Sequence, residues 1–296
     1  MKQFLGIDVG GTFIKSALVS ETGQLGQEDK VLTPDNIADF LACLDELIEN
    51  HREQISGVGI SAPGRIDVDK GYLYVGGALT YLKDIAIKEV IETKHGLPCA
   101  VINDAKAAVL AEHWLGNLKG VSNGAALVLG TGVGSGIILK DELLQGSHFQ
   151  AGELTFNLRS PGPITWQNMS GSAGSAVGFI KRAAECLGLE NTSDGQAVFE
   201  ALKTGQHPEV QELFENYCRE IVFILYNLQA VVDVEKVVIG GGISSQDLLI
   251  DTIRKIYLDY KRGSEIYDFM FTDLVIEPCA FRNGSNLLGA VSLLIR

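Results

Sequence analysis

Two adjacent polar residues, Asn103 and Asp104, have the types and placement that could activate a hydroxyl group. They follow an apolar, strand-like run at 99–102 and precede a helical pattern from about residue 105. A helix N-cap would account for one of the two, but accounts less well for an adjacent pair. A carboxylate here can accept a hydroxyl proton, and the neighbouring amide can hydrogen-bond adjacent hydroxyls. The pair is therefore the equipment expected for phosphoryl transfer to a polyol.

The chain has 34 glycines among its 296 residues, and nine of them form three clusters that each follow an apolar run. These are Gly10–Gly11, residues 130–136 and residues 240–242. Glycine lets backbone N–H groups face an anion without obstruction by a Cβ. A dinucleotide fingerprint fails because Ile137 stands where a glycine is needed, and the chain has no Gly-Lys-Ser/Thr triplet of a Walker loop. A hairpin turn explains any one cluster, but three together predict a nucleotide cleft.

Charged residues near these clusters add candidate roles. Asp8 precedes the first cluster. A carboxylate beside a phosphate site would normally repel the ligand, but it can hold Mg²⁺ there, usually through water. Lys15 on the next predicted strand could balance the phosphate charge. It could equally be an exposed strand lysine without a role in binding. Glu153 is bracketed by apolar residues in a predicted loop over 146–170, which makes it a ligand candidate as well as a candidate solvated charge.

A strand, a Gly/Thr turn and a second strand open the chain at 4–19, and the same unit recurs at 125–139. This repeat predicts a duplicated α/β fold, with a domain boundary in the polar, glycine-rich segment 117–124. Helical periodicity and apolar runs predict the other elements. The predicted helices cover about 35–48, 85–94, 105–114, 174–187, 194–204, 208–231, 248–260 and 286–295, and the predicted strands 55–60, 99–102, 236–239 and 275–278.

Composition excludes several classes of protein. The chain has 37 acidic and 24 basic residues, a net charge of −13, which argues against a nucleic-acid-binding surface. No run approaches the roughly 20 apolar residues of a membrane helix, and the first residues do not resemble a signal peptide. We therefore expect a soluble, cytoplasmic protein without a membrane or nucleic-acid partner.

Five short motifs occur in an order that resembles the ROK family of sugar kinases, in the actin-like ATPase superfamily. They are Asp8-Val9-Gly10-Gly11-Thr12, Ile102-Asn103-Asp104-Ala105, Leu129-Gly130-Thr131-Gly132-Val133-Gly134, Ala151-Gly152-Glu153 and Ile239-Gly240-Gly241-Gly242. The resemblance implies a duplicated ribonuclease H-like fold of two α/β lobes, with a nucleotide and sugar cleft between them. The first lobe would span residues 1–117 and be closed by the C-terminal helix 286–296. The second would span 118–285.

The same resemblance implies roles for individual residues. Asp104 resembles the catalytic base, and Asn103 and Glu153 resemble sugar-hydroxyl ligands. Asp8 resembles the carboxylate on the magnesium side. The nucleotide and its phosphates would contact Gly10, Gly11, Thr12, Lys15, Thr131, Gly132, Gly241 and Gly242, and the sugar cleft would include Gly64 and Gly77.

Two departures from the family pattern bear on the substrate. Many members carry a histidine where this chain has Phe156, followed by a cysteine-rich zinc cluster. No cysteine occurs here between Cys99 and Cys186, so we expect no structural zinc. Gly76-Gly77-Ala78-Leu79 also replaces a common Asn-containing segment. Both changes disfavour plain glucose and resemble the zinc-less β-glucoside kinases.

We therefore expect an ATP- and Mg²⁺-dependent sugar kinase that acts on a primary hydroxyl, O6, of a hexose or β-glucoside. N-acetylmannosamine kinase and glucokinase remain the alternatives within the family. A non-catalytic sugar-sensing protein is the alternative from another class, and the presence of Asp104 and Asp8 argues against it. The family's repressors carry a helix-turn-helix before the first strand, which here begins at about residue 4, so no DNA-reading element is expected. Relatives are commonly dimers, which predicts a homodimer.

Overall fold

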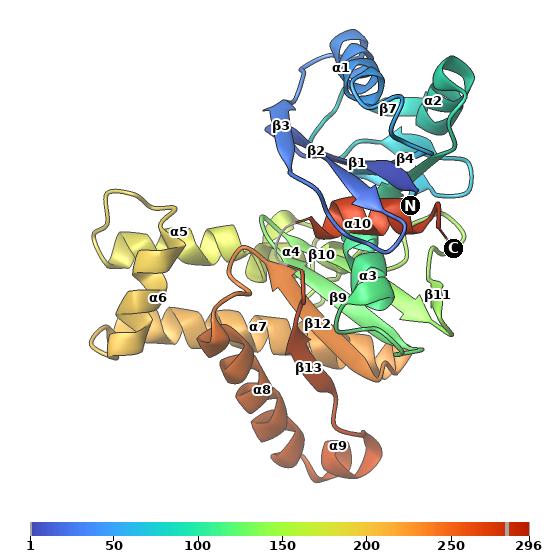
Figure 1. Cartoon of the computed structure of the whole chain (residues 1–296). Coiled ribbons are helices and arrows are strands. Elements are labelled where there is room, and N and C mark those ends of the chain that lie inside the picture. Colours follow the sequence, from blue (N-terminus) through green and yellow to red (C-terminus); the bar gives the residue numbers. More distant parts are fainter. Residues whose placement is uncertain (1, 282–283, 296) are drawn as a thin grey trace.

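Two five-stranded sheets of matching topology organise the molecule, which is a computed structural model describing residues 2–281 and 284–295 (Figure 1). The first sheet has the order β3-β2-β1-β4-β8. β1 (Gln3–Val9), β2 (Phe13–Ser20) and β3 (Asp29–Leu32) form an antiparallel run. β4 (Val58–Ala62) and β8 (Cys99–Asn103) continue the sheet parallel to β1. Parallel strands place their carboxyl ends, and the residues that follow them, at one edge.

The second sheet repeats this arrangement in the order β11-β10-β9-β12-β13. β9 (Gly124–Leu129) is paired antiparallel with β10 (Val133–Leu139), which pairs with β11 (Glu142–Leu143). β12 (Lys236–Gly241) and β13 (Val275–Pro278) run parallel to β9. The same middle strand, hairpin and parallel pair occur twice, so the duplicated α/β fold predicted from the sequence repeat is confirmed.

Two helices, α3 (Asp104–Leu115) and α10 (Ser285–Ser292), lie between the sheets (Figure 1). α10 packs against α3, β1 and β4, while α3 also packs against β10 and β9. The close approach of α10 to α3 depends on Gly289, because a Cβ at this position would overlap the backbone of Ala107. The predicted C-terminal segment is thus a helix that returns to the first sheet. Met1, residues 282–283 and Arg296, which the predicted lobes include, lie outside the described residues, and the boundary near residue 117 stays a prediction.

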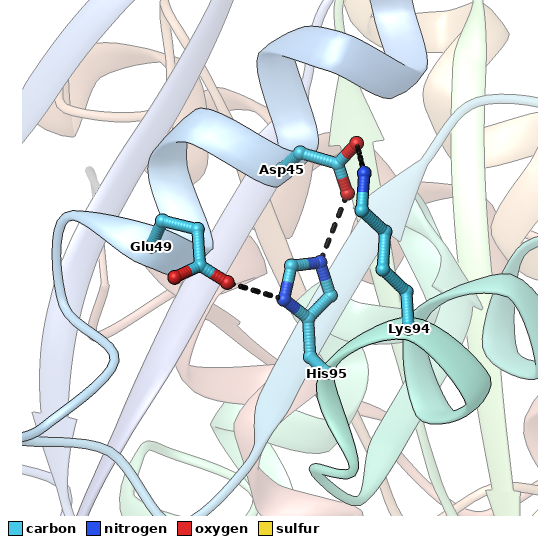
Figure 2. A network of polar contacts seen from close by, with 4 residues as sticks. All are labelled: Asp45, Glu49, Lys94 and His95. Carbon is cyan, nitrogen blue, oxygen red and sulfur yellow. Dashed lines mark hydrogen bonds and ion pairs between the residues drawn. The ribbon is translucent and has the colours of Figure 1, made fainter.

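α1 (Ile37–Glu49) and α2 (Ile87–His95) accompany the first sheet. Their contact contains a charged network around the His95 side chain, which is 1% exposed (Figure 2). His95 Nε2 lies 2.9 Å from Asp45 Oδ1, and Nδ1 lies 2.8 Å from Glu49 Oε1. Lys94 pairs with the other oxygen of Asp45. Two carboxylates on one face of α1 therefore hold the end of α2.

A three-stranded sheet, which the sequence analysis did not predict, follows the loop after β4. It consists of β5 (Arg65–Asp67), β6 (Tyr72–Val75) and β7 (Lys83–Ala86). The helix predicted from residue 85 begins two residues later, because Lys83–Ala86 pairs with β6.

Helices cover the second sheet, and α7 runs along it in the lower half of the molecule (Figure 1). The helices are α4 (Ser170–Ala173), α5 (Ala176–Cys186), α6 (Gly195–Thr204), α7 (Pro208–Val232), α8 (Asp247–Arg262) and α9 (Glu265–Met270). The Phe179 ring of α5 stacks on Tyr217 of α7, with centroids 4.9 Å apart, inside the largest apolar core. No helix in the described part of the chain is long and apolar enough to cross a membrane.

Candidate active site

Asp104 lies at the edge where the parallel strands of the first sheet end. It is the first residue of α3, directly after β8, and it is partly buried. Burial raises the pKa of the Asp104 carboxyl to about 6, and the negative charges of Asp8 and Glu153 raise it further, against a hydrogen bond from the Ala105 N–H. Asp104 can therefore take up a proton close to neutral pH.

Asn103 has the capping role that the sequence analysis held as an alternative. Its Oδ1 accepts the N–H groups of Ala105 at 3.0 Å and Lys106 at 3.2 Å. Its Nδ2 donates to the carbonyl of Gly64 at 3.1 Å. Gly77 lies beside Gly64, since a Cβ on Gly77 would be 3.7 Å from the Gly64 nitrogen. The two glycines predicted for the sugar cleft thus stand next to the Asn103–Asp104 pair, and their contact with sugar stays a prediction.

Asp8 stands near the end of β1, at the same edge. Its Oδ1 accepts a hydrogen bond from Asn286 Nδ2 at 3.0 Å, and burial raises its pKa. Lys15 is opposite Asp8 in the β1–β2 register, but its ammonium group forms an ion pair with Glu28 at 3.1 Å. Lys15 is therefore paired with a carboxylate in this structure, and its contact with phosphate stays a prediction.

A cavity of about 480 Å³ brings residues of α3 and α10 together with residues of the second sheet. Its lining includes Asp104 and Asn286, and also Thr131 and Gly132 in the turn after β9. A second cavity of about 640 Å³ shares the lining residue Gly130. It extends over α5 and α6 and includes Gly242, which follows β12. The structure thus places Asp104, Thr131, Gly132 and Gly242 along two adjoining cavities.

The other predicted phosphate-side glycines do not line these cavities. Gly10, Gly11 and Thr12 form the turn between β1 and β2, where Gly11 and Thr12 are exposed. Gly241 ends β12 with a φ of +102°, and a Cβ there would overlap the carbonyl of Leu129. Their contacts with nucleotide stay predictions.

The later glycines of the cluster at 130–136 have another role. The turn ends at Gly132, and Gly134 and Gly136 belong to β10. A Cβ on Gly136 would overlap Val109 and lie 2.9 Å from the carbonyl of Ala105. These two glycines therefore allow α3 to pack on β10 instead of forming the turn.

Glu153 lies in the irregular segment after β11 and is partly buried. Burial raises the pKa of its carboxyl, while the positive charge of Lys106 lowers it. Since Glu153 also raises the pKa of Asp104, the two carboxylates act on one another electrostatically.

Four residues at this site were missed by the sequence analysis: Lys106, Thr155, Trp166 and Asn286. Thr155 and Trp166 line the smaller cavity, and the Thr155 hydroxyl bonds both the N–H and the carbonyl of Val133. The sequence gives little indication of Thr155 and Trp166 as site residues, because both lie in a segment without helical or strand periodicity. Asn286 was noted only as the start of the closing helix.

Residues 4–296 match the model of the ROK family. The chain belongs to the ROK family. It is 29% identical over 289 residues to a β-glucoside kinase of Listeria monocytogenes, covering 96% of this chain and 94% of that one. A ROK family protein from Streptococcus pneumoniae in complex with sucrose superposes with a TM-score of 0.86 at 26% identity, covering 98% and 96% of the two chains. A ROK family glucokinase from Streptomyces griseus in complex with glucose and AMPPNP gives 0.82 at 25% identity, covering 98% of each. The actin-like ATPase fold predicted for the chain is therefore confirmed.

Phe156, at the position where the resemblance implies a histidine in many ROK members, is 59% exposed. Among the residues described here, no group of three or more His, Cys, Asp or Glu side chains is arranged to hold a metal ion. The prediction of no structural zinc continues to rest on the spacing of the cysteines.

Proposed function

We propose that this ROK-family chain is an ATP-dependent sugar kinase that transfers the γ-phosphate to O6 of a hexose or β-glucoside. The observation that carries the proposal is the position of Asp104. It lines the same cavity as Thr131 and Gly132 in the turn after β9, and its pKa of about 6 suits a general base.

In the proposed reaction, the Asp104 carboxylate takes the proton of the acceptor hydroxyl. That oxygen forms a bond to the γ-phosphorus as the bond to the bridging β–γ oxygen breaks, and ADP leaves with those electrons. Backbone N–H groups at Thr131 and Gly132 would stabilise the phosphate charge. Asn103 and Glu153 would bind the acceptor, next to the loops of Gly64 and Gly77.

The larger cavity suits the nucleoside of ATP. Its volume of about 640 Å³ lies in the range of small-molecule sites. It adjoins the smaller cavity at Gly130, so a nucleoside placed there would direct its phosphates toward Asp104.

The donor set at Asp8 fits a magnesium ion held through water. Its carboxylate is partly buried, and a cation would offset the desolvation that raises its pKa. When bound, the ion would neutralise charge on the phosphates.

Kinetics with ATP and a panel of acceptors tests this function. Glucose, a β-glucoside with a free 6-hydroxyl and N-acetylmannosamine separate the proposed substrate from its alternatives. ³¹P–¹H correlation spectra of the product locate the phosphate. The matched control is Asp104→Asn, for which we expect kcat to fall by about 10²–10⁴-fold with sugar binding retained. No ATP-dependent product with any sugar, or near-normal kcat in the variant, would refute the proposal.

The homodimer expected from the resemblance is proposed as well, and sedimentation equilibrium measures it. A monomer mass throughout the micromolar range would exclude that assembly.

A further inference from the structure

Lys106 is a buried lysine in the first turn of α3, two residues after the proposed base, and its side chain is among the largest that are buried fully. It is 2% exposed. An ammonium group is costly to bury unless it is paired and hydrogen-bonded. The phosphoryl-transfer steps above do not use this group, so its partners indicate what else it does.

The first partner is a backbone carbonyl in the segment that carries Glu153. Lys106 Nζ donates to Phe149 O at 2.9 Å. Phe149 has a φ of +61°, a left-handed conformation that is unfavourable for a bulky side chain. Its ring stacks on Tyr74 of β6, with centroids 6.0 Å apart. The ammonium group therefore holds a strained turn in which the two halves of the chain touch.

The charge of Glu153, at the other end of the same segment, also acts on Lys106. Lys106 and Glu153 stabilise one another's charged forms, against the burial that disfavours both. Between these ends, the Ser135 hydroxyl of β10 donates to the carbonyl of Gly152. The segment of residues 149–153 is thus held by two hydrogen bonds, from Lys106 to the Phe149 carbonyl and from Ser135 of β10 to the Gly152 carbonyl.

The local charge explains why a cation is needed here. Asp8, Asp104 and Glu153 are near enough for the first and last to raise the pKa of Asp104. A buried carboxylate without a compensating cation takes up a proton more readily. A protonated Glu153 would lose the charge that makes it a strong acceptor for a sugar hydroxyl.

We propose that Lys106 is a positioning residue of the acceptor site, which anchors the 149–153 segment through the Phe149 carbonyl and thereby holds Glu153 in place for an acceptor hydroxyl. This inference rests on the proposed sugar-kinase function. It predicts that Lys106 affects acceptor binding much more than nucleotide binding, since Lys106 holds the segment of Glu153 and does not line the cavity assigned to the nucleoside.

The experiment replaces Lys106 by Met, which keeps the length of the side chain and removes its charge. We expect the KM for the acceptor to rise at least tenfold, with the KM for ATP within about twofold of the wild type. Lys106→Arg should restore much of the acceptor affinity because it keeps a charged donor. The matched control is Lys261→Met. Lys261 is also buried and pairs with Asp268 at 2.8 Å and Asp273 at 3.0 Å, at the end of α8, and this variant should leave both KM values unchanged.

A double-variant cycle decides whether Lys106 acts through Glu153. If it does, Lys106→Met should add little to the acceptor KM of Glu153→Gln. Fully additive effects, or an acceptor KM within twofold of the wild type in Lys106→Met, would overturn the inference. If that variant does not fold, Lys106→Gln, which keeps a donor for the Phe149 carbonyl, undergoes the same comparison. Wild-type protein inactive on every sugar would overturn the function itself, whereas active wild type with normal Lys106 variants overturns this inference alone.

Discussion

Asp104 should set the acid limb of the pH profile. With a folded-state pKa of about 6, roughly 90% of the carboxyl is ionised at pH 7 and roughly 10% at pH 5. Since the proposed base acts only when ionised, kcat/KM should fall about tenfold between these pH values. An aspartate at the ordinary value near 3.9 would lose less than about 10% over the same range, so the raised pKa has a measurable signature.

The assay measures initial rates from pH 4.5 to 8 with both ATP and acceptor well below their KM. Under these conditions the profile reports the ionisation of the free protein. A ¹³C NMR titration of the Asp104 carboxyl should give the same pKa without turnover. Its resonance is assigned as the one that is absent in Asp104→Asn. The matched variant is Glu153→Gln, which removes one of the charges that raise the pKa of Asp104. Its acid limb should move to lower pH.

Two results would refute this reasoning. A rate constant unchanged between pH 7 and pH 5 would mean that burial does not raise the pKa as described. An acid limb that moves to higher pH in Glu153→Gln would mean that Glu153 does not act on Asp104 through its negative charge.

Three further changes concern stability. Folding raises the pKa of Asp104, so protonation of this carboxyl favours the folded state. This contribution to the free energy of unfolding is present below pH 4 and is lost as the pH rises through 6. Asp104→Asn should therefore be more stable than the wild type at pH 8, by up to about 3 kcal/mol in urea unfolding, and no more stable at pH 4. Glu112 is fully buried and accepts the N–H groups of Asn117 at 2.9 Å and Phe281 at 3.0 Å. Glu112→Ala should cost about 2–4 kcal/mol of unfolding free energy, and Glu112→Gln less, since it keeps an acceptor. His95→Gln removes a charge-assisted contact between α1 and α2 and should cost about 1–3 kcal/mol (Figure 2). In His95→Gln we expect faster amide hydrogen exchange in α1 and α2 and an unchanged KM for the acceptor.

Local pattern was enough to predict the duplicated fold and the position of the Asn103–Asp104 pair. A strand, a glycine turn and a second strand have recognisable signals, and the end of a parallel strand brings the next residues to a common edge. The three-stranded sheet over residues 65–86 was missed because its strands have only three or four residues each. Periodicity needs a longer window than that to be detected.

The glycine cluster at 130–136 shows a different limit. Composition cannot distinguish a glycine in a turn from one that lets a helix approach a strand. Gly132 is in the turn, whereas Gly136 makes room for Val109, a residue 27 positions earlier in the chain. That distinction depends on the packing of α3 against β10, which the local sequence does not encode.

The packing of α3 also explains why Lys106 and Glu112 were overlooked. On a helix with one wet face, charged residues are expected to point to solvent. α3 instead lies between two sheets and α10, and residues from Ala105 through Glu112 are all buried. Both charges therefore need partners, and they find them in Phe149, 43 residues further on, and in Phe281, 169 residues further on. A junction between strand and helix places the proposed base by local geometry, but the buried charges beside it acquire their partners only when the second sheet and the C-terminal segment pack around α3. For this reason, variants of Lys106 and Glu112 test the tertiary assembly of the site more directly than variants of its sequence motifs.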